Sequence, residues 1–135
     1  MIALDTNIVV RILTGDDPDQ FAIASERVAD EDLWLCKTVV LESEWVLRYT
    51  YRFSREGIYK GFRRLLGYER LQLEDRDSVL NALAWYSQGM DFADALHLSS
   101  SAGADRFVTF DRDLAEAAET LGKAPAVELL PSKRL

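Results

Sequence analysis

The sequence predicts an α/β protein of three layers, in which helices cover both faces of a parallel sheet of four or five strands. Short apolar runs alternate along the chain with longer segments whose apolar residues recur at helical spacing. A helix that connects two strands acts as a crossover, and crossovers make neighbouring strands parallel. The chain has 135 residues, of which 48% are hydrophobic and 29% charged, as in one ordinary globular domain. We therefore expect a single α/β/α domain over residues 1–135.

The first half of the chain begins with a buried strand that ends at Leu4 and a short, largely buried helix at about residues 7–13. Asp17 is placed to cap the next helix, with Pro18 at its first position. That helix, at about residues 18–30, is expected to bury Phe21, Ala24 and Val28. The elements expected after it are a strand at 33–36, helices at 38–51 and 54–66, and a short strand at 71–73.

The second half continues the alternation, and glycines mark the ends of its first two helices. The first of them is expected to bury Val79, Leu80, Leu83 and Ala84. The expected elements are a helix at about 75–88, a helix at 91–102, a strand at 106–110, a helix at 113–121 and a strand at 126–130.

Composition excludes several classes of protein. No apolar run approaches the roughly 20 residues that span a bilayer, and the chain opens with no secretory signal, so we expect a cytoplasmic protein without a membrane. Cys36 is the single cysteine, which rules out an internal disulfide and a Cys/His zinc site. The net charge of −7 argues against nucleic-acid binding across the whole surface.

Four carboxylates stand where strands end or helices begin. Asp5 ends the first strand, and Asp111 directly follows the strand at 106–110. Glu42 and Asp94 each lie about one turn into an expected helix. Because strand ends and first helical turns meet at one edge of a parallel sheet, we expect these four acids to share one pocket.

Such a cluster has a chemical use. Carboxylates a few ångströms apart cannot all stay ionised unless a cation joins them. Hard oxygen ligands suit Mg²⁺ or Mn²⁺, which retain waters and engage phosphates. One or two such ions activate the attacking water and stabilise the leaving oxygen of a phosphodiester. The four acids therefore predict phosphodiester hydrolysis.

Each acid also has a plainer interpretation. A helix dipole favours acids such as Glu42 and Asp94 in its first turn. Asp5 and Asp111 can instead cap the helices that follow them. The neighbouring acids Asp91 and Asp113 can likewise serve as helix caps or surface charges. Thr6 and Asn7 could orient Asp5 or bind a metal-bound water or a phosphate, and Thr109 could do the same at the strand before Asp111. Local turn hydrogen bonds are the alternative for all three.

Four segments together resemble the motifs of PIN-domain ribonucleases, and more narrowly VapC-type toxins of bacterial toxin–antitoxin pairs. The resemblance covers nearly the full length, with the motifs in the expected order. The segments are Ile2-Ala3-Leu4-Asp5-Thr6-Asn7, Glu42-x-x-Trp45-Val46-Leu47-Arg48, Asp91-Phe92-Ala93-Asp94-Ala95-Leu96-His97 and Val108-Thr109-Phe110-Asp111.

The resemblance implies a Mg²⁺- or Mn²⁺-dependent endoribonuclease. It makes Asp5 and Asp94 the best metal ligands, with Glu42 and Asp111 completing the acidic site. Many relatives place an Asn at the position of Asp111 and an acid shortly after it, so Asp113 is an alternative fourth acid. The supporting residues would be Thr6, Asn7, Asp91 and Thr109.

The resemblance also implies partners. These are an RNA substrate, a second copy of the chain in a homodimer and a small cognate antitoxin that covers the active-site groove. Contact with DNA would be indirect, through the antitoxin. None of these partners follows from composition or spacing.

One local feature suits an RNA substrate. Residues 47–70 contain seven basic residues, Arg70 included, and two acids, which gives this segment a net charge of +5. Aromatic residues interleave with them, a combination that can bind RNA by charge and stacking. A solvated helix face with extended arginines is the alternative. The candidate RNA-binding residues are Arg48, Arg52, Arg55, Lys60, Arg63 and Arg64.

Two other functions are open on the residues alone. Asp5 could act as the nucleophile of a phosphohydrolase, although such enzymes usually have a second Asp two residues on, where this chain has Asn7. The acids could also serve only as caps in a catalytically silent antitoxin- or RNA-binding module.

Overall fold

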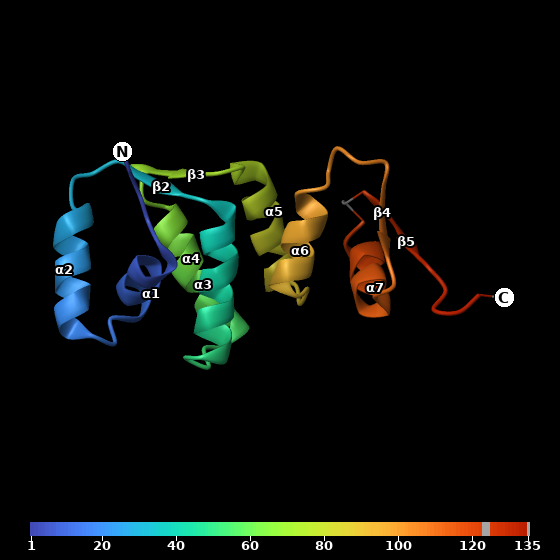
Figure 1. Ribbon diagram of the computed structural model, residues 1–135, viewed down its shortest axis with the longest axis horizontal. Coiled ribbons are helices and arrows are strands. Elements are labelled where there is room, and N and C mark those ends of the chain that lie inside the picture. Colours follow the sequence, from blue (N-terminus) through green and yellow to red (C-terminus); the bar gives the residue numbers. More distant parts are fainter. Residues whose placement is uncertain (123–124, 135) are drawn as a thin grey trace. The chain divides into compact units, whose positions relative to one another are not determined.

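The computed structural model describes residues 1–122 and 125–134, so Leu135, the last residue of the predicted domain, lies outside the described residues. The chain divides into two compact units, Met1–Arg76 and Asp77–Leu135. Helices and parallel strands alternate in both, which confirms the predicted α/β class. The described residues contain five strands, which pair as one group of three and one group of two (Figure 1).

The first unit is built on a parallel sheet with the strand order β1-β2-β3. Ile2 lies opposite Leu33, and Leu33 lies opposite Leu71. The strands are short, and residues in β2 and β3 alternate between buried leucines and more exposed side chains. The bounds are β1 (Ile2–Ala3), β2 (Leu33–Leu35) and β3 (Leu71–Leu73).

Four helices accompany this sheet, and they begin close to the predicted positions. Asp17 caps one of them by accepting from the Gln20 N–H at 3.1 Å, and Ser54 caps another by accepting from the Gly57 N–H at 3.1 Å. The helices are α1 (Thr6–Thr14), α2 (Pro18–Val28), α3 (Lys37–Tyr49) and α4 (Arg55–Leu66).

The core of the first unit joins its helices. Val9, Val40, Leu47, Ile58 and Phe62 are almost completely shielded from solvent. The prediction that α2 buries Phe21 is wrong, since this side chain is 40% exposed. Only Ala24 of α2 is fully buried, because this helix lies at the margin of the unit, where it packs chiefly against α1.

The described residues of the second unit form three helices and a two-stranded parallel sheet. Its core includes Val79, Leu83, Tyr86 and Phe92, and the last two rings meet edge to face at 5.4 Å. The predicted burial of Ala84 is wrong, because this side chain is exposed. The bounds are α5 (Arg76–Ser87), α6 (Phe92–Ser99), β4 (Arg106–Thr109), α7 (Arg112–Leu121) and β5 (Ala126–Leu129).

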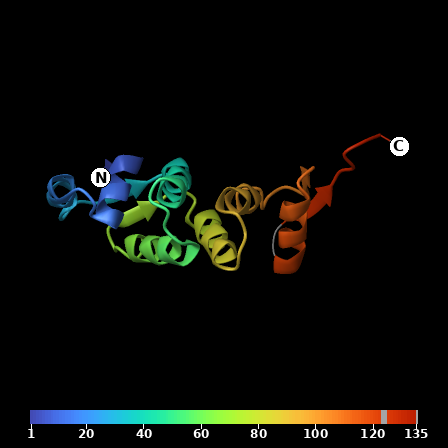
Figure 2. The same ribbon diagram turned by 90° about the horizontal axis from the view of Figure 1, so that it is seen from below.

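The helix α7 packs beside both strands of its sheet (Figures 1 and 2). β4 and β5 pair in parallel, with Phe107 opposite Val127. None of the helices in the described ranges combines the length and apolar character needed to cross a membrane.

Candidate active site

Asp5 stands at the junction between β1 and α1. The Leu4 N–H donates to the carbonyl of Trp34 at 3.0 Å, so the ladder continues to the residue before Asp5. The Asp5 carbonyl then accepts from the N–H groups of Ile8 and Val9. Its side chain is exposed and accepts no hydrogen bond from the first turn of α1. Asp5 therefore occupies the cap position without acting as a side-chain cap, which leaves its carboxylate available to a ligand.

Glu42 is held next to this junction. The Thr6 hydroxyl, which is buried directly after Asp5, donates a short hydrogen bond to Oε1 of Glu42. The interpretation of Glu42 as a first-turn acid is wrong, because α3 begins at Lys37 and has no acid in its first turn. Thus α3 brings a second carboxylate to the end of β1.

Two acids of the second unit do cap helices. Asp91 accepts from the Asp94 N–H at 3.1 Å, and Asp111 accepts from the Leu114 N–H at 3.1 Å. The hydroxyl of Thr109 accepts from the Asp111 N–H at 2.9 Å, so the local turn interpretation of Thr109 is correct. The cap bond of Asp111 uses only Oδ1, so capping and metal binding are compatible for this carboxylate.

Asp94 shows that the acids of α6 and α7 influence one another. Burial raises the pKa of Asp94, repulsion from Asp91 and Asp111 raises it further, and His97 partly opposes the shift. Asp91 and Asp111 are 20 positions apart in the sequence, yet both act on this carboxylate. A bound cation would remove the cost of ionising Asp94 here.

The remaining predicted residues are less constrained. Asn7 and Asp113 are exposed, and Asp113 lies in the first turn of α7. Within residues 1–122 and 125–134, no group of three or more His, Cys, Asp or Glu side chains is arranged to hold a metal ion. In the first unit, Thr6 bonds Glu42 directly after Asp5 in the chain, and in the second unit Asp91 and Asp111 both act on Asp94.

The donors present fit a hard cation. They are carboxylate oxygens, and the Asp5 carboxylate makes no capping hydrogen bond to α1. Cys36 precedes α3, where its Sγ lies 3.3 Å from the Thr38 hydroxyl. Oxygen donors of this kind suit Mg²⁺ or Mn²⁺ better than a thiophilic ion.

The predicted basic patch is partly neutralised. Arg48 pairs at 2.9 Å with Glu44, which is buried, and Lys60 pairs at 2.9 Å with Glu56. Arg63 lies 5.9 Å from the centre of the Tyr59 ring. The patch therefore offers less unpaired charge than its sequence count suggests.

The chain matches the PIN domain family over residues 2–120, which span both units. The chain belongs to the PIN domain family. PIN domains are generally nucleases, and PIN nucleases generally use divalent metals, in keeping with the oxygen donors at Asp5 and Glu42. A search of curated proteins returned no match.

The sequence did not reveal what holds Glu42. Thr6 was expected to orient Asp5 or to make a local hydrogen bond, but in this PIN domain it bonds a residue 36 positions away. No local pattern encodes a partner at that separation. The sequence drew attention to Glu42 only because it is an acid in a largely apolar stretch.

Proposed function

We propose that this PIN domain, taken as one domain over residues 1–135, is a Mg²⁺- or Mn²⁺-dependent endoribonuclease. The proposed ligands are Asp5 and Glu42 from the first unit and Asp94 with Asp111 from the second, with Asp113 as the alternative to Asp111. The observation that carries the proposal is the exposed Asp5 carboxylate, which stands at a helix N-terminus and yet makes no capping bond.

The residues have separate tasks in this proposal. Thr6 fixes one oxygen of Glu42, so that the other oxygen faces a ligand in a constant orientation. The Asp5 carboxylate contributes negative charge at the N-terminus of α1, where the helix dipole favours it. The amide of Asn7 can donate to a phosphate oxygen. A bound metal would supply the Lewis acidity that activates water and neutralises the charge of the leaving oxygen.

The test is cleavage of RNA by purified protein with Mg²⁺, with Mn²⁺ and with EDTA. Wild type should cleave in either metal and be inactive in EDTA. Asp5→Asn and Asp94→Asn should each lose at least about 100-fold in rate, since removing an essential electrostatic group typically costs this much. Circular dichroism should show both variants folded.

Asp105→Asn is the matched control, because it removes the same charge from an exposed loop acid. It should cleave like wild type. Retention of full, EDTA-sensitive activity by both Asp5→Asn and Asp94→Asn would refute the site. Cleavage that is indifferent to EDTA would refute metal dependence.

We further propose that the protein is the toxin of a toxin–antitoxin pair in the cytoplasm. Its partners would be a second copy of the chain and a cognate antitoxin, with DNA reached only through the antitoxin. The family match and the four motifs support this assignment. Expression without an antitoxin should arrest growth, and the Asp94→Asn variant should not.

A further inference from the structure

A pocket of about 450 Å³ lies between α1 and α2 in the first unit. We call it the α1–α2 pocket. Arg11 and Arg27 line it together with the amide side chains of Asn7 and Gln20. The described residues that line it include no carboxylate, although the chain as a whole carries a net charge of −7. Donors of hydrogen bonds therefore dominate its polar lining.

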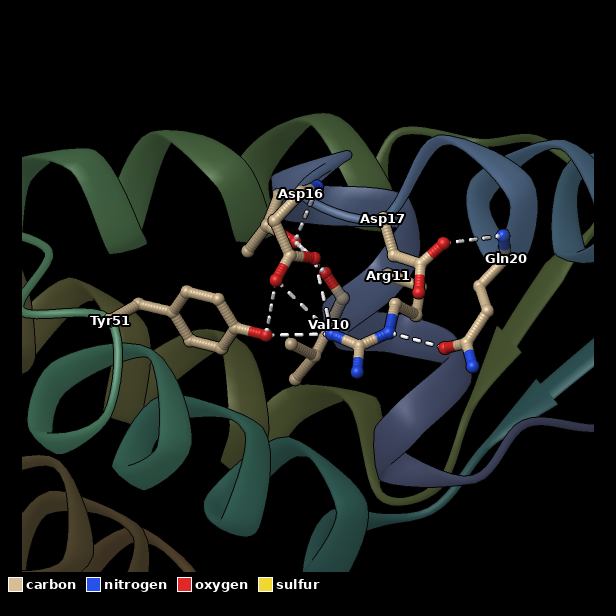
Figure 3. Close-up of polar contacts among 7 residues, drawn as sticks. Val10, Arg11, Asp16, Asp17, Gln20 and Tyr51 are labelled. Carbon is tan, nitrogen blue, oxygen red and sulfur yellow. Dashed lines mark hydrogen bonds and ion pairs between the residues drawn. The ribbon is translucent and has the colours of Figure 1, made fainter.

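Arg11 is fixed in place by its neighbours (Figure 3). Its Nε donates to Oε1 of Gln20 at 2.6 Å, and its Nη1 donates to the Tyr51 hydroxyl at 2.7 Å and to Oδ1 of Asp16 at 3.1 Å. The Tyr51 hydroxyl in turn donates to Oδ2 of Asp16 at 2.8 Å. Gln20 of α2, Asp16 in the loop before α2 and Tyr51 in the loop after α3 therefore hold one guanidinium in a single orientation.

This arrangement uses only part of the guanidinium. Nε and Nη1 have partners, whereas Nη2 has none among the described residues, and Figure 3 draws that nitrogen without a dashed line. The hydrogen bond to Tyr51 and the charge of Asp16 raise the pKa of Arg11. A rigid cation with spare donors binds an anion at a lower entropic cost than a mobile one.

Arg27 offers a second cation at the same pocket. Its contact with Glu31 is 3.2 Å long, and the two side chains are 63% and 40% exposed. An exposed pair of this kind contributes about 0–1 kcal/mol. Arg27 can therefore leave Glu31 and bind a phosphate with little loss of free energy.

The α1–α2 pocket adjoins the Asp5 end of α1. Asn7 lines the pocket and stands in the first turn of α1, two residues after Asp5. Ile8 and Ile23 add apolar wall beside the donors. A strand that places one phosphate at Asp5 can thus place a neighbouring nucleotide along α1 and α2.

We propose that the α1–α2 pocket is a subsite for a phosphate of the RNA strand, next to the one that is hydrolysed. Arg11, Arg27 and Asn7 donate to its non-bridging oxygens. Ile8 and Ile23 contact the attached nucleoside. The assignment of RNA rests on the proposed nuclease function, whereas the assignment of an anion rests on the pocket alone.

The first measurement uses inorganic phosphate as the probe and the full chain in EDTA. Titration followed by ¹H–¹⁵N NMR should shift the side-chain signals of Asn7, Gln20 and the Arg11 Nε–H. Absence of a saturable shift at these groups would overturn the anion site. Shifts confined to the Arg48–Arg64 segment would overturn it as well.

The second measurement uses a mixed-sequence, single-stranded oligoribonucleotide in EDTA, so that binding is read without cleavage. Arg11→Gln and Arg27→Gln should each weaken binding about 5–20-fold, and the negative slope of log K against log salt should become shallower by about 0.7. Arg11→Lys should keep that slope but lose affinity, because a lysine cannot reproduce the fork of donors. Arg27→Gln guards against misfolding, since Arg27 belongs to no buried network.

Arg76→Gln is the matched control, because Arg76 is an exposed cation at the start of α5 and lies outside the pocket. It should bind RNA like wild type. Equal affinity in wild type, Arg11→Gln and Arg27→Gln, with cleavage intact, would overturn the subsite alone. A wild type that binds phosphate in the pocket but neither binds nor cleaves RNA would overturn the RNA assignment together with the proposed function.

Discussion

At the scale of single residues, Asp5 and Asp17 form a natural comparison. Both are aspartates in the N-cap position of a helix. Asp17 accepts a hydrogen bond from the Gln20 N–H, whereas Asp5 accepts none from its helix. A position suited to capping therefore does not by itself reveal whether the side chain is used as a cap.

This comparison gives a stability prediction. Asp17→Ala should lower the free energy of unfolding by about 1 kcal/mol, the usual cost of losing a cap. Asp5→Ala should change it by less than about 0.5 kcal/mol. Urea unfolding in EDTA measures both. A loss for Asp5→Ala as large as that for Asp17→Ala would mean that Asp5 is structural.

Capping was the plainer interpretation of several acids, and it is correct for some of them and not for others. It holds for Asp91 and Asp111, whose bonding partners lie three residues on, but the side chain of Asp5 does not cap α1. Glu44, two residues after the exposed Glu42, pairs with Arg48 and is only 1% exposed. Burial of an acid depends on what packs over it, which a local pattern does not specify.

At the scale of elements, the sequence predicted the order and type of every helix and strand described. Caps and glycines explain this success, because they act over three or four residues. The helix expected at 91–102 ends earlier, at Ser99. There the Ser101 N–H bonds the Leu98 carbonyl and the Ser101 hydroxyl bonds the His97 carbonyl, so serine forms a turn before Gly103 is reached.

Phe21 on α2 was expected to be buried, but its side chain is 40% exposed. Apolar spacing predicts which face of a helix turns inward, but it does not predict how far neighbouring elements cover that face. The pairing of elements, such as α1 with α3, is also beyond local spacing.

The link between α1 and α3 carries a further prediction. Thr6→Val keeps the shape of the side chain but removes the hydroxyl that bonds Glu42. RNA cleavage should fall about 10-fold or more, as is usual when the partner of a metal ligand is removed. Initial rates at several Mg²⁺ concentrations would show the loss.

Thr120→Val is the control, because its hydroxyl bonds only the Glu116 carbonyl within α7. This variant should cleave at the wild-type rate. Equal rates for wild type and Thr6→Val, across all Mg²⁺ concentrations, would show that the orientation of Glu42 does not limit the reaction.

At the scale of the whole molecule, the proposed function makes stability depend on metal. The folded chain binds the ion and the unfolded chain does not, so Mg²⁺ at ten times its Kd adds about 1.4 kcal/mol. For a chain of 135 residues this corresponds to a rise in Tm of about 5 °C. In EDTA no cation offsets the repulsion of Asp94 by Asp91 and Asp111, so this repulsion should lower the free energy of unfolding.

Asp94→Asn separates these two effects. Burial and the neighbouring acids raise the pKa of Asp94 above 3.8, so the folded state disfavours its ionised form. Below pH 3.8 the carboxyl is protonated in both states and the variant has no advantage. As pH rises through the raised pKa, wild type loses stability that the amide retains.

The prediction is a crossing of stabilities at neutral pH. In EDTA, Asp94→Asn should melt above wild type, because the amide replaces a carboxylate whose ionised form is disfavoured by burial and by the neighbouring acids. In saturating Mg²⁺ it should melt below wild type, because it has lost a ligand. Differential scanning calorimetry in both buffers measures the crossing. If Mg²⁺ stabilised Asp94→Asn as much as wild type, Asp94 would not be a metal ligand. A higher Tm in EDTA alone would then reflect only relieved repulsion among the acids of α6 and α7.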